Sequence, residues 1–506
     1  MMSHAATAPC DEGLVAAVHG ASAQRHRKGT LAATILGSSL AFIDGSVVNV
    51  ALPAIERDLA SSGASGASIG WLINAYLLTL GALVLVGGVA GDRYGRKRMF
   101  IAGVVVFTAA SLACALAPGF AWLLAARALQ GVGAALLVPA SLAILGAAFE
   151  GEARGHAVGT WAAASAITGA LGPLVGGWLV DVVGWRAIFL INLPIAAIAV
   201  WLSWREVDES RSDETPPLDL AGAALATVGL GLATFGLTAL ATRGAAAAIH
   251  VGALGGGAAL AAGALALVAF VLVEARLGRR AMMPLALFGT SAFVGVTLLT
   301  LCLYAALSGM VVLLPYLLIS RAGWAAAAAG AALLPLSLAM GLGSRAAGKL
   351  AERVGTRVVL TIGPVVVAAG FALFLRIDAG AVHYASDVLP ALVLVACGLT
   401  LSVAPLTSAV IAAVDPSHVG SASGVNNATA RVAGLLATAL LGYVLAADAS
   451  GPAFVGRFHG AAIVGAVLAL AAAASAYFLC APVSGSRGRR GPAPSAAPEA
   501  RSRRRS

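Results

Sequence analysis

Two of the ionisable residues that interrupt apolar stretches of this sequence could do chemistry. Asp44 lies within residues 31–53 and Arg127 within residues 121–148, and both stretches are otherwise free of charge. A carboxylate in such surroundings is costly to keep ionised, so it can bind and release a proton. Asp44 is therefore our main candidate for a proton-coupling or cation-binding residue. The alternative is a neutral aspartic acid that hydrogen-bonds to a neighbouring helix.

Arg127 stays charged at any physiological pH and needs partners in an apolar interior. Backbone carbonyls, Gln130 or a carboxylate would serve, and beside an acid the arginine would favour release of the acid's proton. Alternatively, its side chain extends toward the outer membrane interface. Asn49 is expected to hydrogen-bond to another helix, with a ligand contact as the alternative.

The elements that carry these residues are predicted to be membrane-spanning helices. The chain has 506 residues, is 60% hydrophobic and 11% charged, and has a mean hydropathy of +0.93. A bilayer core takes about 20 apolar residues per helix, and runs of that length recur between short polar breaks. We predict fourteen spans, at residues 31–53, 69–90, 99–118, 121–148, 157–180, 187–204, 219–240, 251–274, 290–319, 326–348, 358–376, 388–413, 421–446 and 459–481.

The positions of lysine and arginine predict the orientation. With both termini in the cytoplasm, 23 of the 32 Lys and Arg residues fall on the cytoplasmic side, 6 on the opposite side and 3 within spans. This asymmetry follows the positive-inside rule and predicts a multi-pass protein of the cell membrane. Residues 1–30 are then a cytoplasmic tail, and residues 482–506 a disordered, basic cytoplasmic tail. The net charge of +10 reflects topology and contact with anionic membrane lipid, not binding of nucleic acid.

A short motif occurs twice, 260 residues apart. The duplication predicts two six-helix halves, residues 31–204 and 290–481, with two further spans in residues 205–289. A tight glycine turn in each motif would gather acidic and basic side chains that latch one conformation, and the alternative is that these residues only fix topology. The residues are Gly91, Asp92, Arg93, Gly95 and Arg96 in the first copy, and Glu352, Arg353, Gly355 and Arg357 in the second.

The fifth span contains a cluster of glycines around a proline. Proline removes a backbone hydrogen bond, and the glycines let a partner helix approach closely. This combination predicts a bendable hinge, with plain helix packing as the alternative. The residues are Gly169, Gly172, Pro173, Gly176 and Gly177.

Other chemistry finds little support in the sequence. The five cysteines are scattered, and the eight histidines fall in tails, loops or near helix ends, so no disulfide framework or metal site is predicted. The stretch from Gly343 to Lys349 has phosphate-loop spacing, but Leu350 stands where Ser or Thr would bind magnesium. We expect no cofactor, no ATP-driven step and no enzyme active site.

Four of these motifs resemble the major facilitator superfamily, and within it the branch of fourteen-helix drug:proton antiporters. The stretch from Gly91 to Arg98 is similar to the superfamily's signature loop, whose aspartate and arginines gate the cytoplasmic side. Asp44-Gly-Ser-Val-Val-Asn-Val-Ala-Leu-Pro53 is similar to the branch's first-helix motif, with Ser46 replacing the usual threonine. The remaining two are Arg127 to Gly133, similar to a fourth-helix motif whose arginine is associated with proton transfer, and Gly169 to Gly177, similar to the fifth-helix antiporter motif.

The resemblance implies an all-α membrane protein with the major facilitator fold, two six-helix bundles plus two extra helices. It implies proton-coupled export of hydrophobic or amphiphilic small molecules, such as drugs or secondary metabolites, by a monomer. The alternative is a proton-coupled importer of a small polar solute on the same fold. Unlike some exporters of the branch, span 421–446 has no acidic residue, so divalent cations are not the expected substrates.

Substrate contacts are expected from polar and aromatic side chains of a central cavity. For the tyrosines near helix ends, anchoring at the membrane interface is the alternative role. The candidate residues are Asn49, Tyr76, Gln130, Trp161, Tyr304 and Tyr316.

Overall fold

The computed structural model describes residues 9–211, 219–241, 255–278, 281, 283–378, 382–414, 419–445 and 452–480. Within these residues, fourteen helices are long and apolar enough to cross a membrane, and none of the described residues lies in a strand. This confirms the predicted number of spans and the all-α fold class. The predicted C-terminal tail, residues 482–506, lies outside the described residues.

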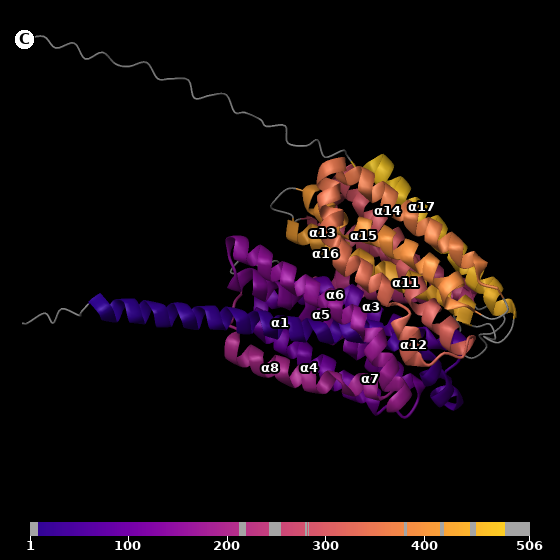
Figure 1. Ribbon diagram of the computed structural model, residues 1–506, viewed down its shortest axis with the longest axis horizontal. Coiled ribbons are helices and arrows are strands. Elements are labelled where there is room, and N and C mark those ends of the chain that lie inside the picture. Colours follow the sequence, from indigo (N-terminus) through magenta and orange to yellow (C-terminus); the bar gives the residue numbers. More distant parts are fainter. Residues whose placement is uncertain are drawn as a thin grey trace, which may run out of the picture.

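The chain forms two bundles that lie side by side (Figure 1). The N-terminal bundle consists of α1 (Pro9–Leu59), η1 (Ala60–Ser62), α2 (Gly66–Ile69), α3 (Trp71–Tyr94), α4 (Arg96–Ala115), α5 (Phe120–Ala148), α6 (Gly151–Val182), α7 (Ala187–Leu190) and α8 (Asn192–Glu206). The C-terminal bundle consists of η3 (Leu285–Gly289), α11 (Ser291–Ser320), α12 (Ala326–Ala331), α13 (Leu334–Val354), α14 (Thr356–Leu373), η4 (Phe374–Arg376), η5 (Tyr384–Val388), α15 (Leu389–Ala412), α16 (Val419–Leu445) and α17 (Pro452–Leu479).

The first helix is longer than its predicted span. It runs without a break from Pro9, so the described part of the predicted tail, residues 9–30, is helical and continuous with the span. Apolar content predicts where a helix crosses the membrane, whereas the helix itself can continue into polar residues that lie outside the bilayer.

Two inserted helices, α9 (Leu220–Ala241) and α10 (Gly256–Leu277), pack against each other as a pair. Of the two, α9 also packs against α3 of the N-terminal bundle and α16 of the C-terminal bundle. The inserted pair therefore lies along the seam where α3 and α16 meet.

The repeated motifs do not form the loops that their polar sequences suggest. Each is a one-residue break between two helices, at Gly95 with φ 110° and ψ 128°, and at Gly355 with φ 95° and ψ 135°. Glycine adopts a positive φ without the steric cost that a side chain would add. The acidic and basic residues of each motif therefore lie on helix ends, and the two breaks have nearly the same backbone geometry.

Glycines bring the helices of the N-terminal bundle into backbone contact. A Cβ at Gly87 in α3 would lie 2.0 Å from the carbonyl oxygen of Ala135 in α5, and one at Gly131 would lie 2.4 Å from that of Tyr76. In lipid, such close packing replaces the hydrophobic effect as the force between helices. The position of α5 against α3 is therefore fixed at two points along the helices, at Gly87 and at Gly131.

The contact at Gly87 predicts a matched pair of stability effects. Gly87→Ala should lower the unfolding temperature of the detergent-purified protein, because overpacking against a backbone costs about 1–3 kcal/mol. Gly88→Ala is the control, since its added Cβ would meet only Pro139 at 3.7 Å, an ordinary contact. Tryptophan fluorescence during heating measures both, and equal unfolding temperatures for the two variants would contradict the packing described.

Candidate functional site

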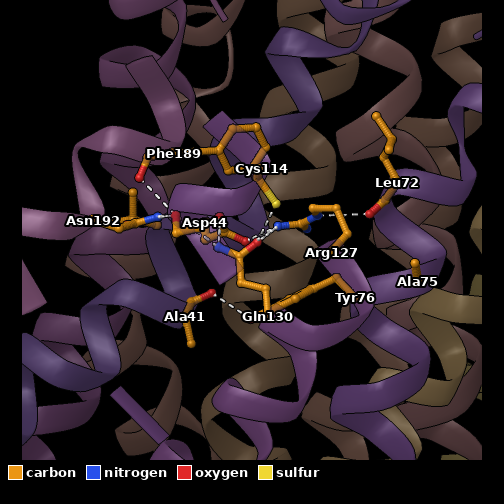
Figure 2. A network of polar contacts seen from close by, with 12 residues as sticks. Ala41, Asp44, Leu72, Ala75, Tyr76, Cys114, Arg127, Gln130, Phe189 and Asn192 are labelled. Carbon is orange, nitrogen blue, oxygen red and sulfur yellow. Dashed lines mark hydrogen bonds and ion pairs between the residues drawn. The ribbon is translucent and has the colours of Figure 1, made fainter. Parts of the chain in front are cut away.

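A buried network of charged and polar side chains lies at the centre of the N-terminal bundle (Figure 2). Asp44 lies in α1, eighteen residues from each end of the span His26–Ser62, and is 0% exposed. Its Oδ2 pairs with Nη1 of Arg127 from α5, which is 1% exposed. Gln130, one helical turn after Arg127, donates its Nε2 to Asp44 Oδ1 at 2.7 Å and accepts from Arg127 Nη1 at 2.7 Å. Each side chain of this triad thus contacts the other two.

Arg127 has further partners that carry no charge. Its Nε donates to the carbonyl oxygen of Leu72 at 3.0 Å, and its guanidinium lies 4.5 Å from the ring centroid of Tyr76. Tyr76 in turn donates its hydroxyl to the carbonyl oxygen of Ala41 at 3.2 Å. Arg127 therefore faces inward, and the alternative of a side chain that extends to the outer interface is wrong.

Residues that the sequence did not single out complete the network. Ser111 Oγ accepts from Asn192 Nδ2 at 2.9 Å and lies 3.4 Å from Gln130 Nε2, and the thiol of Cys114 points at Gln130 Oε1 at 3.8 Å. Serine and cysteine are common in membrane-spanning helices, so Ser111 and Cys114 did not stand out in the sequence as candidate site residues. Asn192, an amide within an apolar stretch, is the one that could have been suspected.

The chemistry of the triad follows from its burial. A buried ion pair is held by strong attraction, and removing one partner leaves an uncompensated charge. A proton on Asp44 would cancel the carboxylate charge, but Leu72, Gln130 and Tyr76 would still contact the guanidinium. Asp44 could therefore gain or lose a proton while the guanidinium of Arg127 keeps its neutral partners.

The glycine cluster of the fifth span lies on α6 between the two bundles. On one face, a Cβ at Gly172 would lie 1.9 Å from Ser46 Oγ, and one at Gly176 would lie 2.0 Å from Val47 Cγ2, both on α1. On another face, a Cβ at Gly177 would lie 2.3 Å from the carbonyl oxygen of Ala326 in α12. Gly177 thus permits backbone contact between α6 and the C-terminal bundle.

The other two cluster residues differ. The carbonyl oxygen of Pro173 lies 2.0 Å from where a Cβ of Gly330 in α12 would be, whereas nothing lies within 4 Å of a Cβ at Gly169. Helix α6 continues through Pro173 to Val182. Close packing accounts for four of the five residues in this conformation, and bending remains a prediction.

Polar contacts between the bundles lie near one end of the molecule. We call this end the outer face, the side that the lysine and arginine pattern predicts to be opposite the cytoplasm, and the other end the inner face. Asp181 accepts from the backbone N–H groups of Ala326 at 3.1 Å and Ala327 at 2.8 Å, at the start of α12. Tyr316 donates to Glu56 Oε2 at 3.0 Å.

A third contact joins Thr438 of α16 to Asn74 Oδ1 of α3. Within the described part of the chain, the recorded hydrogen bonds between the two bundles all lie in this outer half. Sequence reasoning missed Glu56 and Asp181, although an acidic residue at the outer end of a span was the available signal.

The repeated motif at the inner face makes contacts within its own bundle and with the segment that follows α8. Asp92 pairs with Arg96 at 2.7 Å, and Glu209, another residue missed from sequence, accepts from the backbone N–H groups of Lys97 at 3.0 Å and Arg98 at 3.2 Å. Glu209 thus caps the start of α4, where the helix dipole favours an anion.

In the second copy of the motif, the charged residues do not gather. Arg357 donates to the carbonyl oxygen of Tyr477 and lies 4.9 Å from its ring centroid. Among the described residues, Glu352 and Arg353 form no ion pair. The expectation of an acidic–basic cluster therefore holds for the first motif alone in this conformation.

The remaining predicted cavity residues are not brought together. Trp161 packs in a small core cluster and donates to Ser38 Oγ at 3.0 Å. Tyr316 is 5% exposed and is neither an interface anchor nor part of the charge network. Asn49 does not form the expected hydrogen bond to another helix within the described residues. Its buried Oδ1 has no partner there. Tyr304 is half-buried.

The tight α6–α12 contact predicts a conformational effect. Gly177→Ala should separate the bundles at the outer face, because its Cβ would meet the Ala326 backbone, whereas Gly169→Ala should change nothing. Spin labels at Ser62 and Gly323, in a variant whose native cysteines are replaced by serine, report the separation by pulsed electron resonance. A longer distance in Gly177→Ala is expected, and an unchanged distance would show that the contact does not hold the bundles together.

Comparison with known proteins agrees with this geometry. The family model "Major Facilitator Superfamily" matches residues 34–294, which contain the whole charge network. The chain is 34% identical over 421 residues to "Multidrug resistance protein Stp" of Mycobacterium tuberculosis, covering 83% of this chain and 76% of that protein. It is 36% identical over 446 residues to "Cephamycin export protein CmcT" of Amycolatopsis lactamdurans, covering 86% and 88%.

Among solved structures, the crystal structure of a D-xylose-proton symporter has a TM-score of 0.63 and 17% identity, over 90% of this chain and 98% of that one. This likeness concerns the fold alone. Taken with the sequence matches and the fourteen helices, it leads to one identification: the chain belongs to the Major Facilitator Superfamily, in the branch with fourteen membrane-spanning helices.

Proposed function

We propose that this protein exports hydrophobic or amphiphilic small molecules across the cell membrane in exchange for protons. It works as a monomer with both termini in the cytoplasm, and the proton gradient drives it without ATP or a bound cofactor. The observation that carries the proposal is the buried Asp44–Arg127–Gln130 triad. The names of the relatives, which include multidrug resistance and cephamycin export, support export over import of a polar solute.

Asp44 is the proton-binding group in this proposal. When it is ionised, its pairing with Arg127 ties α1 to α5 inside the N-terminal bundle. When Asp44 takes up a proton, its electrostatic attraction to Arg127 is lost, and the neutral partners of Arg127 hold the guanidinium in place. Proton binding therefore changes how firmly α1 is held.

A line of direct contacts leads from Asp44 to the C-terminal bundle. Two and three residues after Asp44, Ser46 and Val47 lie against Gly172 and Gly176 of α6, and Gly177 one residue later lies against α12. Close-packed helices move as discrete units rather than deforming continuously. A shift of α1 would thus be passed through α6 to the contact that closes the outer face.

We infer the direction of coupling from the conformation. The bundles are joined at the outer face, so we assign this structure to the state that is closed to the outside. Release of a proton to the cytoplasm would restore the Asp44–Arg127 pair, and uptake of a proton from outside would loosen it. In the opposite conformation, which is open to the outside, the substrate is released to the outside.

Replacing the proton-binding group should uncouple transport. In everted membrane vesicles with an acidic interior, adding a substrate dye should cause proton release by the wild-type protein, seen with a pH-sensitive fluorophore. Asp44→Asn should reduce this response at least tenfold, since an amide cannot carry the proton. Thermal unfolding should show whether the variant is folded.

The matched control is Asp58→Asn, the same change on the same helix. Asp58 is exposed at the outer end of α1, where it pairs with Arg186 at 2.7 Å, and its replacement should leave the proton response intact. A full response from folded Asp44→Asn, or dye export that persists after a protonophore collapses the gradient, would refute proton coupling through Asp44.

A further inference from the structure

Arg431, like Arg127, is a cation inside the membrane-spanning part of the chain. It lies in α16, nine residues after the start of the span Ala422–Leu445. At about 1.5 Å per residue, its Cα is roughly 13 Å from the inner end of that span, beyond the reach of an arginine side chain. A permanent charge at this depth is costly and usually marks a functional position.

The side chain of Arg431 leaves α16 toward the other bundle. A Cβ at Gly81 in α3 would lie 3.2 Å from the Cβ of Arg431. Helix α16 packs against both α3 of the N-terminal bundle and α11 of the C-terminal bundle. The side chain of Arg431 therefore starts where the N-terminal and C-terminal bundles face each other.

No carboxylate balances this charge within the described residues. Arg431 forms none of the recorded ion pairs or hydrogen bonds, in contrast to Arg127. Of the elements that pack against α16, namely α2, α3, α9, α11, α15 and α17, the described residues include an acidic one only in α3. That residue, Asp92, is at the inner end of α3 and pairs with Arg96.

Arg431 is only half-buried, unlike Arg127. A guanidinium donates several hydrogen bonds and carries a permanent positive charge, so it suits an anionic oxygen. Asp44, the buried acid of the N-terminal bundle, is already paired with Arg127.

We propose that Arg431 binds an anionic group of the transported molecule, so that the protein exports amphiphilic monoanions such as carboxylates or sulfonates. This inference rests on the proposed export function and names its substrate class. The bound anion would supply the countercharge that the protein itself lacks. Span 421–446 has no acidic residue and carries the positive charge of Arg431. It would therefore select anions, whereas an acidic residue in this span would select cations.

Two dyes with one scaffold test the proposal. Anilinonaphthalene sulfonate is an anion at all relevant pH values, and phenylnaphthylamine is its neutral counterpart. Wild-type protein in proteoliposomes of zwitterionic lipid, energised with a proton gradient, should transport both. Arg431→Gln should reduce transport of the sulfonate at least tenfold and leave transport of the neutral dye within twofold, and Arg431→Lys should retain part of the sulfonate transport.

The control is Arg457→Gln, which removes a positive charge from α17 near the outer face, where Arg457 contacts the Tyr443 carbonyl at 2.7 Å. It should affect neither dye. Equal loss of both dyes in Arg431→Gln, or unchanged sulfonate transport, would overturn the inference. The anion site is also refuted if anionic lipid, and not the sulfonate, raises the unfolding temperature in a manner that depends on Arg431.

The wild-type protein separates this inference from the proposed function. Transport of the neutral dye without the sulfonate would leave export standing and refute the anion site. If neither dye moves, the export function fails, and the anion site fails with it.

Discussion

The pairing of Asp44 with Arg127 is the interaction on which the N-terminal bundle depends. Both charges are almost completely excluded from solvent, so each needs the other and the hydrogen bonds of Gln130. That requirement fixes α5 against α1. The close glycine contacts between α5 and α3 then place the carbonyl oxygen of Leu72 within reach of the guanidinium. The small residues therefore serve the charge network as well as helix packing in lipid.

The same helix that carries Asp44 is in contact with the helix that meets the other bundle. Gly172 and Gly176 face α1, and Gly177 faces α12, so a single stretch of α6 contacts both partners. Side chains at these positions would hold the helices apart and weaken any mechanical link between them. Polar contacts then complete the outer closure, through Asp181 at the start of α12 and through Glu56 with Tyr316.

The two bundles share a backbone plan but differ in their charges. The glycine breaks at Gly95 and Gly355 have nearly the same dihedral angles, as a duplication would leave them. The N-terminal bundle holds a balanced buried pair, whereas the C-terminal bundle contributes Arg431, which no described carboxylate balances. This difference suits a division of labour, in which one bundle binds protons and the other binds the charged part of a substrate.

The sequence by itself determined the fourteen spans, the glycine breaks and the buried pair of candidates Asp44 and Arg127. These features depend on local properties: hydropathy over about 20 residues, the conformational freedom of glycine, and the cost of a charge in lipid. Only the tertiary structure decided which residues meet. Asp44 and Arg127 lie 83 residues apart, and Tyr316 reaches Glu56 across 260 residues. It also showed that Trp161 belongs to a core cluster and that Asn49 lacks its expected bond. Contacts between helices depend on how each helix is rotated about its axis, which nearly uniform apolar spans do not encode.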